Sequence, residues 1–348
     1  MPDTELSMIP RTGLPWQVGE WRKQLAAAVR EPAELLRRLE FSPTAIRRLL
    51  PAARTAAEDF PLRVPDAFIA LMKPGDADDP LLRQVLPLGA ELADSAGFVT
   101  DPLAETDAMA APGLLHKYAG RALLITTPAC AVHCRYCFRR HFPYAEARGM
   151  VEHWRAALGY LAVRPDIEEI ILSGGDPLSL TNGRLGELLT ALRTIPHLRR
   201  LRLHTRLPIV LPQRVDVDLL ELLARQPWPV TVVVHANHPN ELGPDQRLAL
   251  AALRRYGITL LNQSVLLAGV NDDTDSLCRL STALHEVGVL PYYLHLLDRV
   301  TGAAHFEVDE DTARELYRQM AVRLPGYLVP RLVREEAGAA GKTLLADN

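Results

Sequence analysis

The chain has 348 residues, of which 48% are hydrophobic and 23% charged, and its formal net charge is −3. This hydrophobic fraction is enough for a buried core and excludes a disordered chain, while the small net charge argues against a nucleic-acid-binding protein. The sequence has no run of about eighteen apolar residues, so we expect no transmembrane helix. Its first residues lack the basic segment and apolar stretch of a signal peptide, so we do not expect secretion. We therefore expect a cytoplasmic protein that contacts neither nucleic acid nor membrane.

Residues 1–105 are predicted to form a helical region. Apolar residues recur there at helical spacing, as at Leu35, Leu36 and Leu39, and Ser42-Pro43 is typical of a helix start. The region contains no convincing chemical motif.

From residue 122, short β-rich runs alternate with amphipathic stretches. The runs are Ala122–Thr126, Glu169–Leu172, Leu201–Thr205, Val230–His235, Ile258–Gln263 and Tyr292–Leu296. The helix-like stretches lie near 151–163, 184–195, 216–225, 244–256, 273–287 and 311–323. This alternation predicts an α/β fold with a parallel sheet. We favour a partial (β/α)6 barrel over residues 106–330, because the polar motifs follow successive strands; an open doubly wound sheet is the alternative. Residues 331–348 read as a short tail that closes over the barrel mouth, and we do not predict it to be helical.

Three of the four cysteines, Cys130, Cys134 and Cys137, lie within eight residues directly after the first predicted strand. Such a cluster indicates a metal or redox site rather than a disulfide framework. Thiolates select zinc or iron–sulfur clusters, and three of them without a nearby fourth fit a [4Fe–4S] cluster with one open iron. A Cys3His zinc site that uses His133 or His141 is the alternative.

Polar residues also follow the later strands. Each group alone could be an ordinary loop, but groups at consecutive strand ends are expected to line one pocket, because the active site of a βα barrel lies at the carboxyl ends of its strands. The groups are Ser173-Gly174-Gly175-Asp176, His204-Thr205-Arg206, His235 to Glu241, and Asn262-Gln263-Ser264.

The spacing Cys-x3-Cys-x-Tyr-Cys after the first strand resembles that of radical S-adenosylmethionine (SAM) enzymes. The resemblance implies that the open iron chelates the methionine moiety of SAM, and that an electron from a donor such as flavodoxin or ferredoxin cleaves the sulfonium to a 5′-deoxyadenosyl radical. It also implies cofactor-binding roles for Ser173, Gly174, Gly175, Asp176, His235 and Gln263.

Further strings narrow the resemblance: SGGDPL, HANHPNE, NQSVLLAGVND and LHLLDRVTGAAHF. Residues 112–345 resemble the lysine 2,3-aminomutase family, closest to the branch that makes (R)-β-lysine for modification of elongation factor P. This implies an isomerase that uses pyridoxal 5′-phosphate (PLP) and free L-lysine, with a functional link to elongation factor P and its β-lysine ligase. The alternatives are an aminomutase that supplies catabolism or osmolyte synthesis, a radical enzyme without PLP, and a zinc-stabilised binding protein.

The resemblance also implies roles for single residues. Lys342, one of only four lysines in the chain, matches the lysine that holds PLP, although by itself it could be a solvated residue in a frayed tail. Three residues before the first strand match a phosphate site, and three others match the groups that bind substrate. The first set is Lys117, Tyr118 and Arg121; the second is Arg139 for the substrate carboxylate, with Asp298 and Glu335 for its ε-ammonium.

Two departures from the family pattern affect these expectations. The aminomutase pattern has Asp where this chain has Glu335, so ammonium recognition there is less well supported than at Asp298. Aminomutases of lysine catabolism carry C-terminal cysteines for an intersubunit zinc, and no cysteine follows Cys278 here. We therefore expect no such zinc.

Overall fold

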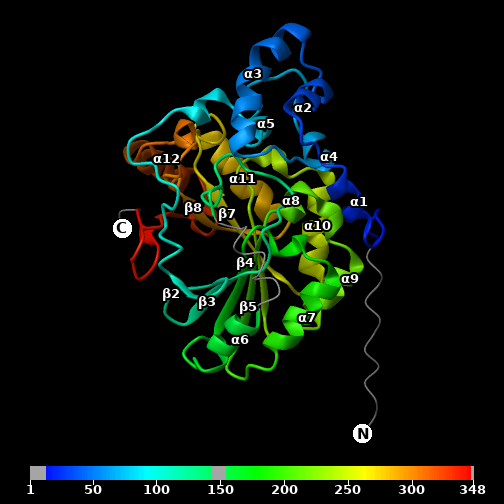
Figure 1. Cartoon of the computed structure of the whole chain (residues 1–348), viewed down its shortest axis with the longest axis vertical. Coiled ribbons are helices and arrows are strands. Elements are labelled where there is room, and N and C mark those ends of the chain that lie inside the picture. The colour runs from blue at the N-terminus through cyan, green and yellow to red at the C-terminus, as the bar shows by residue number, and fades with distance from the viewer. Residues whose placement is uncertain (1–12, 143–153, 346–348) are drawn as a thin grey trace.

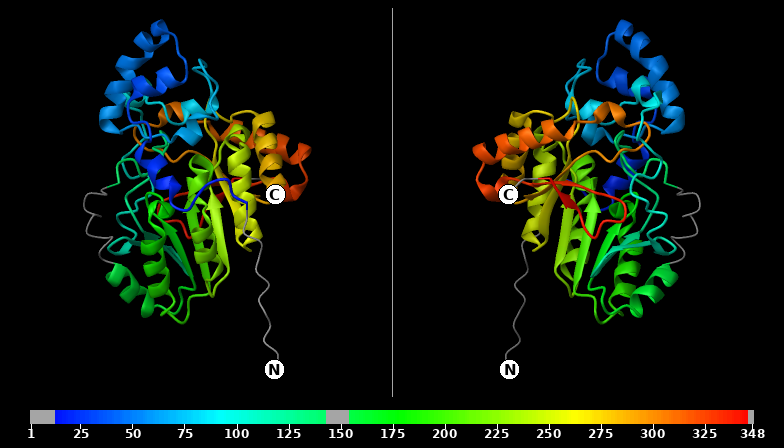
Figure 2. Two further views of the ribbon diagram at one scale, coloured as in Figure 1. Left: turned by 90° about the vertical axis from the view of Figure 1, so that its right-hand side faces the viewer. Right: turned by 90° about the vertical axis from the view of Figure 1, so that its left-hand side faces the viewer.

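A mixed β-sheet forms the centre of the computed structural model, which describes residues 13–142 and 154–345. Its ten strands lie in the order of the sequence, and the strands from β3 to β9 are parallel. Antiparallel pairs extend both edges, and no pairing among the described residues joins β1 to β10, so the sheet is an open, partial barrel (Figure 2). The strands are β1 (Met109–Ala111), β2 (Leu114–Tyr118), β3 (Arg121–Ile125), β4 (Glu169–Ser173), β5 (Arg200–Thr205), β6 (Val230–Val234), β7 (Thr259–Val265), β8 (Leu290–His295), β9 (Arg331–Arg334) and β10 (Thr343–Leu344).

The six predicted strands correspond to β3–β8, and the prediction of a partial barrel is confirmed. The sheet also has strands that we did not predict: the β1–β2 pair before β3, and β9 and β10 within the expected tail. β9 continues the parallel sheet beside β8, and β10 returns along it. These strands have only two to five residues each, too few to show a clear alternation of polar and apolar side chains.

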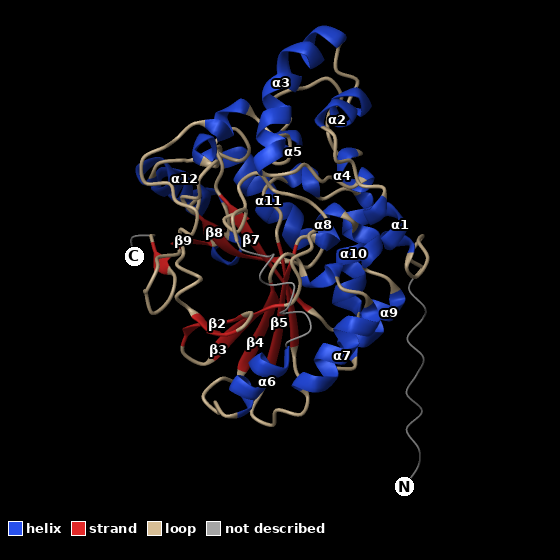
Figure 3. Ribbon diagram, in the orientation of Figure 1, coloured by secondary structure: helices blue, strands red, loops and turns tan. Residues whose placement is uncertain are grey.

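Helices cover the outer side of the sheet (Figure 3). Several begin at a side-chain cap, such as Asp216, Asp273 and Asp309, each of which accepts a hydrogen bond from a backbone N–H of the first turn. They are α6 (Trp154–Ala162), α7 (Asn182–Leu192), α8 (Leu207–Val210), α9 (Val217–Ala224), α10 (Pro244–Arg255), α11 (Thr274–Glu286) and α12 (Glu310–Arg323). They follow the predicted stretches, except for the short helix α8, which was not predicted, and 151–153 lie outside the described residues.

The N-terminal region is helical, as predicted, and its helices α2 and α3 project at one end of the molecule (Figure 1). Its buried side chains, among them Trp21, Leu35 and Leu81, belong to the same hydrophobic core as Leu203 of β5. The region is therefore packed on the barrel rather than hinged from it. Its helices are α1 (Glu20–Ala26), α2 (Pro32–Arg38), α3 (Pro43–Asp59), α4 (Asp66–Ile69), α5 (Pro80–Arg83) and the 3-10 turn η1 (Gly89–Leu92). No helix in the described ranges is long and apolar enough to cross a membrane.

Strand register brings polar side chains together on the inner face of the sheet. Residues two apart share a face, and paired residues of parallel neighbours do so as well. Ile171 pairs with Arg202, His204 with Val233, Val233 with Leu261, and Gln263 with Tyr293. One face therefore carries the following residues, which are half-buried apart from the buried Ser173 and His295: Ser173, His204, His235, Gln263, Tyr293 and His295. The opposite face carries Leu172, Leu203 and Val234, all fully buried under the helices.

Candidate active site at the carboxyl ends of the strands

The cysteine loop begins directly after β3 and is held by the start of the next βα connection. Gly175 and Asp176 donate backbone hydrogen bonds to the carbonyls of Thr127 (2.7 Å) and Ala129 (2.8 Å). A Cβ at Gly175 would lie 2.3 Å from the Ala129 oxygen, and Gly174 has a φ of 122°. The two glycines thus allow the backbone after β4 to lie against the residues that precede Cys130.

Side chains from the N-terminal region hold the middle of the same loop. Arg135 is fully buried, and its guanidinium donates to both carboxylate oxygens of Glu91 and to the carbonyls of Ala56 and Phe60. Arg140 donates to Glu91 as well, at 2.9 Å. A buried, bidentate arginine–carboxylate pair has little freedom of orientation. The N-terminal helices therefore determine where the cysteines lie, which sequence patterns did not indicate.

The three thiols of this loop are half-buried and close enough to affect one another. Burial, followed by the neighbouring thiols, raises the pKa of Cys130 well above its usual range and that of Cys137 to about 11. The described residues place no three His, Cys, Asp or Glu side chains where they could hold a single metal ion. Three soft donors in one loop, with the Arg206 guanidinium 2.7 Å from the Cys134 sulfur, fit an anionic iron–sulfur cluster.

Asp176, expected to contact cofactor, has its carboxylate occupied by the protein. It accepts hydrogen bonds from the Thr205 hydroxyl and from the backbone N–H groups of Leu178 and Arg206. Burial raises its pKa to about 6 in spite of these donors. Its observed role is to join the loop after β4 to the end of β5.

A second polar cluster joins the end of β2 to the β9–β10 pair at the other edge of the sheet. Thr343 of β10 pairs with Arg334 of β9, so this antiparallel pair places Lys342 beside Glu335. The Lys342 ammonium donates a short hydrogen bond to one Glu335 oxygen, and the Tyr118 hydroxyl donates to the other at 3.1 Å. Lys117 lies 3.6 Å from the same carboxylate. Burial alone would raise the pKa of Glu335, but Lys342 and Lys117 outweigh it and lower that pKa to about 2.

Arg139 reaches this cluster through a carboxylate that sequence reasoning missed. Glu105, 4% exposed, accepts from Arg139 Nε (2.6 Å) and Nη2 (2.8 Å), while Arg139 Nη1 donates to the Ser173 hydroxyl (3.1 Å) and the Gly174 carbonyl (3.2 Å). Glu105 also lies 3.7 Å from the Lys117 ammonium. A lone glutamate in a polar stretch gave no sign of burial, because only the fold brings its two cations to it.

Asp298 follows β8 and faces the same charges. Desolvation, followed by the negative charge of Glu335, raises its pKa to about 7, and Lys342 and Lys117 oppose this effect. The charges of Glu335 and Lys342 therefore act on Asp298.

The inner face of the barrel carries three histidines whose pKa values are lowered. Burial lowers the pKa of His235 to about 4 and those of His204 and His295 well below their usual range. The Nε2 atoms of His204 and His295 are buried and have no hydrogen-bond partner among the described residues. Buried polar atoms are rarely left unpaired, so these two are candidates for contact with a bound group. Gln263 lies on the same face, two residues along from Leu261.

Arg121, the third expected phosphate ligand, stacks on the ring of Tyr118 with its guanidinium carbon 4.5 Å from the ring centroid. Tyr293 lies close to the lysine as well, with the Lys342 nitrogen 5.7 Å from its ring centroid. Cationic and phenolic groups within one cluster suit a phosphate and an aromatic ring. Their chemistry fits PLP.

Comparison with known proteins identifies the family to which the chain belongs. Residues 124–280 match the radical SAM superfamily. The L-lysine 2,3-aminomutase of Escherichia coli (strain K12) is 52% identical over 94% of this chain and 94% of that protein. The chain belongs to the lysine 2,3-aminomutase family of radical SAM enzymes. This family consists of isomerases, and its radical SAM membership implies a [4Fe–4S] cluster and SAM.

Other members of the aminomutase family are less similar. The L-lysine 2,3-aminomutase of Haemophilus influenzae is 44% identical over 98% of this chain and 100% of that protein. That of Bacillus subtilis is 33% identical over 85% of this chain and 63% of that protein. A crystal structure of a radical SAM methyltransferase from Sphaerobacter thermophilus matches with a TM-score of 0.41 at 19% identity, covering 64% of this chain and 68% of that chain.

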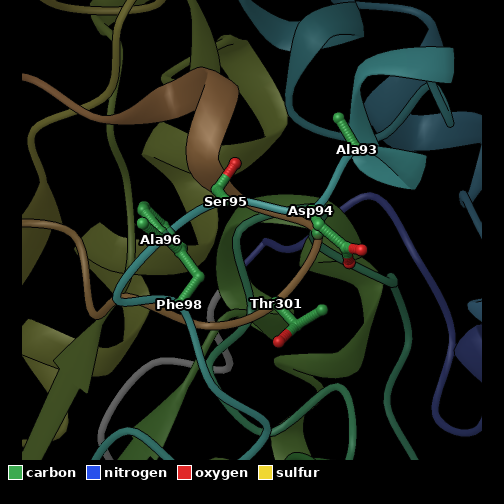
Figure 4. A pocket seen from close by; sticks show the side chains of 7 residues that line it. Ala93, Asp94, Ser95, Ala96, Phe98 and Thr301 are labelled. Carbon is green, nitrogen blue, oxygen red and sulfur yellow. The ribbon is translucent and has the colours of Figure 1, made fainter.

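A separate surface pocket lies outside these clusters. It is lined by Ala93, Asp94, Ser95, Ala96 and Phe98 of one loop, together with Thr301 and Gly302 (Figure 4). Asp94 is the only charged residue among these lining residues, and no arginine, lysine, histidine or cysteine lines the pocket. It lacks the groups that the aminomutase chemistry needs.

Proposed function

We propose that this chain converts L-α-lysine to (R)-β-lysine, with PLP held by Lys342, and that the product serves the modification of elongation factor P. The observation that supports the proposal is the grouping of Lys342, Glu335, Asp298 and Arg139 beside the cysteine loop. These side chains come from three separate segments of the chain and offer both signs of charge, as a zwitterionic amino acid with a second ammonium requires.

The residues would divide the work as follows. Arg139 would bind the substrate carboxylate through the Nη1–Nη2 edge of its guanidinium, since its Nε and Nη2 already donate to Glu105 on the other edge. Its Nη1 already contacts Ser173 and Gly174 of the loop next to the cysteines, so the substrate carboxylate would lie close to the radical source. Asp298 and Glu335 would bind the ε-ammonium at the other end. Lys117, Tyr118 and Arg121 would bind the PLP phosphate.

Bound cofactors would supply the chemistry that no side chain has: PLP stabilises the migrating nitrogen, and the cluster with SAM generates the radical. Glu335 has a distinct role in the sequence of events. It now pairs with the Lys342 ammonium, and that partner is lost when Lys342 carries PLP. Loss of that partner would raise the pKa of Glu335 from about 2, but the Lys117 ammonium, 3.6 Å away, would still favour the ionised carboxylate that accepts the substrate ammonium. No side chain needs to act as a general base, so the protein's main tasks are positioning and exclusion of solvent.

The experiment is anaerobic reconstitution with iron, sulfide and PLP, followed by addition of SAM, a reductant and L-lysine. Chiral chromatography is expected to detect (R)-β-lysine, and Lys342→Ala is expected to lose both the product and the bound PLP absorbance. Lys73→Ala is the matched control, because Lys73 is exposed and pairs with the surface residue Asp76. If 5′-deoxyadenosine formed without β-lysine, the substrate assignment would be wrong.

The link to elongation factor P rests on the family branch. Identity is higher to the E. coli and H. influenzae enzymes (52% and 44%) than to those of Clostridium subterminale and B. subtilis (36% and 33%). Deletion of the gene is expected to remove the β-lysyl mass from elongation factor P, as measured by mass spectrometry of the purified factor. An unchanged mass would favour a role in catabolism or osmolyte synthesis instead.

A further inference from the structure

Arg206 is a buried cation at the cysteine loop that the proposed function leaves without a role. Arg206 follows β5 directly and the residue is 5% exposed. Its Nη1 lies 2.7 Å from the Cys134 sulfur. Its backbone N–H donates to Asp176 at 2.7 Å, which holds the start of the side chain against the loop after β4.

Three further groups keep the Arg206 guanidinium in place. Its Nη2 donates to Gln84 of the N-terminal region (2.7 Å) and to Glu241 (3.1 Å), and its planar group lies over the ring of Phe68 at 5.3 Å. Glu241 accepts from the backbone N–H groups of Asn237 and His238 in addition, so its charge is shared among several donors. The Arg206 cation cannot move away from the sulfur without leaving buried partners unpaired.

A cation at this distance favours extra negative charge on the sulfur and on any iron bound to it. Reduction of a cluster adds one negative charge, and the potential of iron–sulfur centres is raised by hydrogen bonds to sulfur and by nearby positive charge. Burial strengthens the effect, because a low-dielectric surrounding screens the interaction weakly. Glu241 opposes it, but Arg206 lies between that carboxylate and the sulfur.

We propose that Arg206 raises the reduction potential of the cluster held by Cys130, Cys134 and Cys137 by donating a hydrogen bond to the Cys134 sulfur. The inference rests on the proposed function only in requiring the cluster. In the reaction it concerns, an external one-electron reductant of the flavodoxin or ferredoxin type reduces the cluster. The cluster then passes that electron to the SAM sulfonium, whose carbon–sulfur bond breaks to methionine and the 5′-deoxyadenosyl radical. Arg206 is a positioning residue: it determines how readily the first electron is accepted.

The test is a potentiometric titration of the reconstituted protein without SAM, in which electron paramagnetic resonance measures the amount of reduced cluster at each potential. Arg206→Gln is expected to decrease the ratio of reduced to oxidised cluster at least tenfold at the wild-type midpoint, which is a shift of about 59 mV for one electron. Arg206→Lys keeps a cation near the sulfur and is expected to retain most of the wild-type potential. Arg206→Gln combined with Glu241→Gln avoids an unpaired buried carboxylate and is expected to shift in the same direction as the single variant.

Arg214→Gln is the matched control. Arg214 is also a fully buried arginine, but it donates to the carbonyls of Leu178 and Leu180 rather than to a cysteine. Its substitution is expected to leave the potential unchanged. An unchanged potential in Arg206→Gln with full iron content overturns the proposal, even if SAM binding weakens, and so does a shift in Arg206→Lys equal to that in Arg206→Gln. A wild-type protein that forms no cluster contradicts the proposed function instead.

Discussion

Glu105 shows how a single buried carboxylate can organise the cations of this site. It lies between Arg139 and Lys117, and the residue before it, Ala104, has a left-handed φ of 46°. A non-glycine residue in that region costs on the order of 1–3 kcal/mol, which the surrounding structure must offset. The bidentate pair with Arg139 supplies such compensation and fixes the direction of the guanidinium before any ligand arrives.

Substitution of Glu105 tests this pairing. Glu105→Ala removes a buried carboxylate that pairs with Arg139 and is expected to lower the free energy of unfolding by about 3 kcal/mol. Glu105→Gln keeps the shape and one acceptor, so it is expected to cost less. Urea denaturation measures both. Glu34→Ala is the comparison, since the Glu34–Arg38 pair is exposed and worth about 1 kcal/mol or less. Equal losses at the two positions would show that Glu105 has no special role.

Asp298 makes ligand binding depend on pH, because its pKa is raised to about 7. Below that pH the carboxyl group is mostly neutral and offers an ammonium no counter-charge. We expect the affinity for L-lysine to rise between pH 6 and pH 8 (values near this pKa). Asp298→Asn is expected to remove the dependence, which calorimetric titration of lysine into the PLP-loaded protein at several pH values would measure. A wild-type affinity that stays flat across this range would contradict the assignment.

The same residue has an effect on stability of defined sign. A carboxyl whose folded-state pKa lies above its unfolded value of about 3.9 contributes stability that is present below pH ~4 and lost as pH rises through ~7. Asp298→Asn is therefore expected to raise the melting temperature relative to the wild type more at pH 8 than at pH 5 (on either side of this pKa).

At the scale of elements, the connection from β4 to α7 supports the cysteine loop, in addition to its expected role in cofactor binding. Gly175 donates its N–H to Thr127, and Asp176 donates its own to Ala129. The Ser-Gly-Gly-Asp motif is thus a packing surface for the residues before Cys130. Glycine is required there because the two backbones are in contact.

Gly175→Ala is expected to disrupt that contact, since the added Cβ would lie 2.3 Å from a backbone oxygen that cannot swing aside. The consequence is displacement of the cysteine loop and a lower iron content after anaerobic reconstitution, measured by iron and sulfide analysis. Gly186→Ala in α7 is the control, because its Cβ would meet only a side-chain atom of Leu222 at 3.6 Å. Full iron content in Gly175→Ala would show that the loop adapts.

At the scale of the whole molecule, the N-terminal helices act as part of the active-site scaffold. Glu91 of η1 pairs with Arg135 and Arg140 of the cysteine loop, and Gln84 contacts both Glu241 and Arg206. These bonds join residues that lie 44 to 157 positions apart in the chain. The N-terminal helices therefore hold the cysteine loop in place from outside the barrel.

Glu91→Ala tests this arrangement. It removes the only carboxylate that pairs with Arg135 within the described residues and is expected to destabilise the protein by about 3–5 kcal/mol. It is also expected to lower the iron content, whereas Glu105→Ala, on the far side of the loop, is expected to lower lysine affinity more than iron content. Parallel measurement of iron and of lysine binding in the two variants checks the division. Identical losses of both in both variants would argue against it.

Much of the barrel and the cysteine motif was accessible to sequence reasoning. The βα alternation from β3 to α12 repeats a pattern of apolar and polar residues that each element needs on its own, so local sequence predicts it. The Cys-x3-Cys-x-Tyr-Cys spacing is likewise local. The strands β9 and β10 were not predicted, because two to four residues hold no periodicity and are strands only where a sheet edge is available.

What the sequence determined by itself is therefore the class of chemistry: three thiols in one loop, a scarce lysine near the end of the chain, and polar residues at consecutive strand ends. What only the tertiary structure decided is which charges meet. Glu105 and Glu91 belong to no motif in the sequence, and Arg206 belongs only to a polar group after a strand, yet each is buried against a partner at least 34 residues away. Burial and pairing of such charges depend on long-range packing, since a charged side chain enters the interior only where the fold provides its counter-charge.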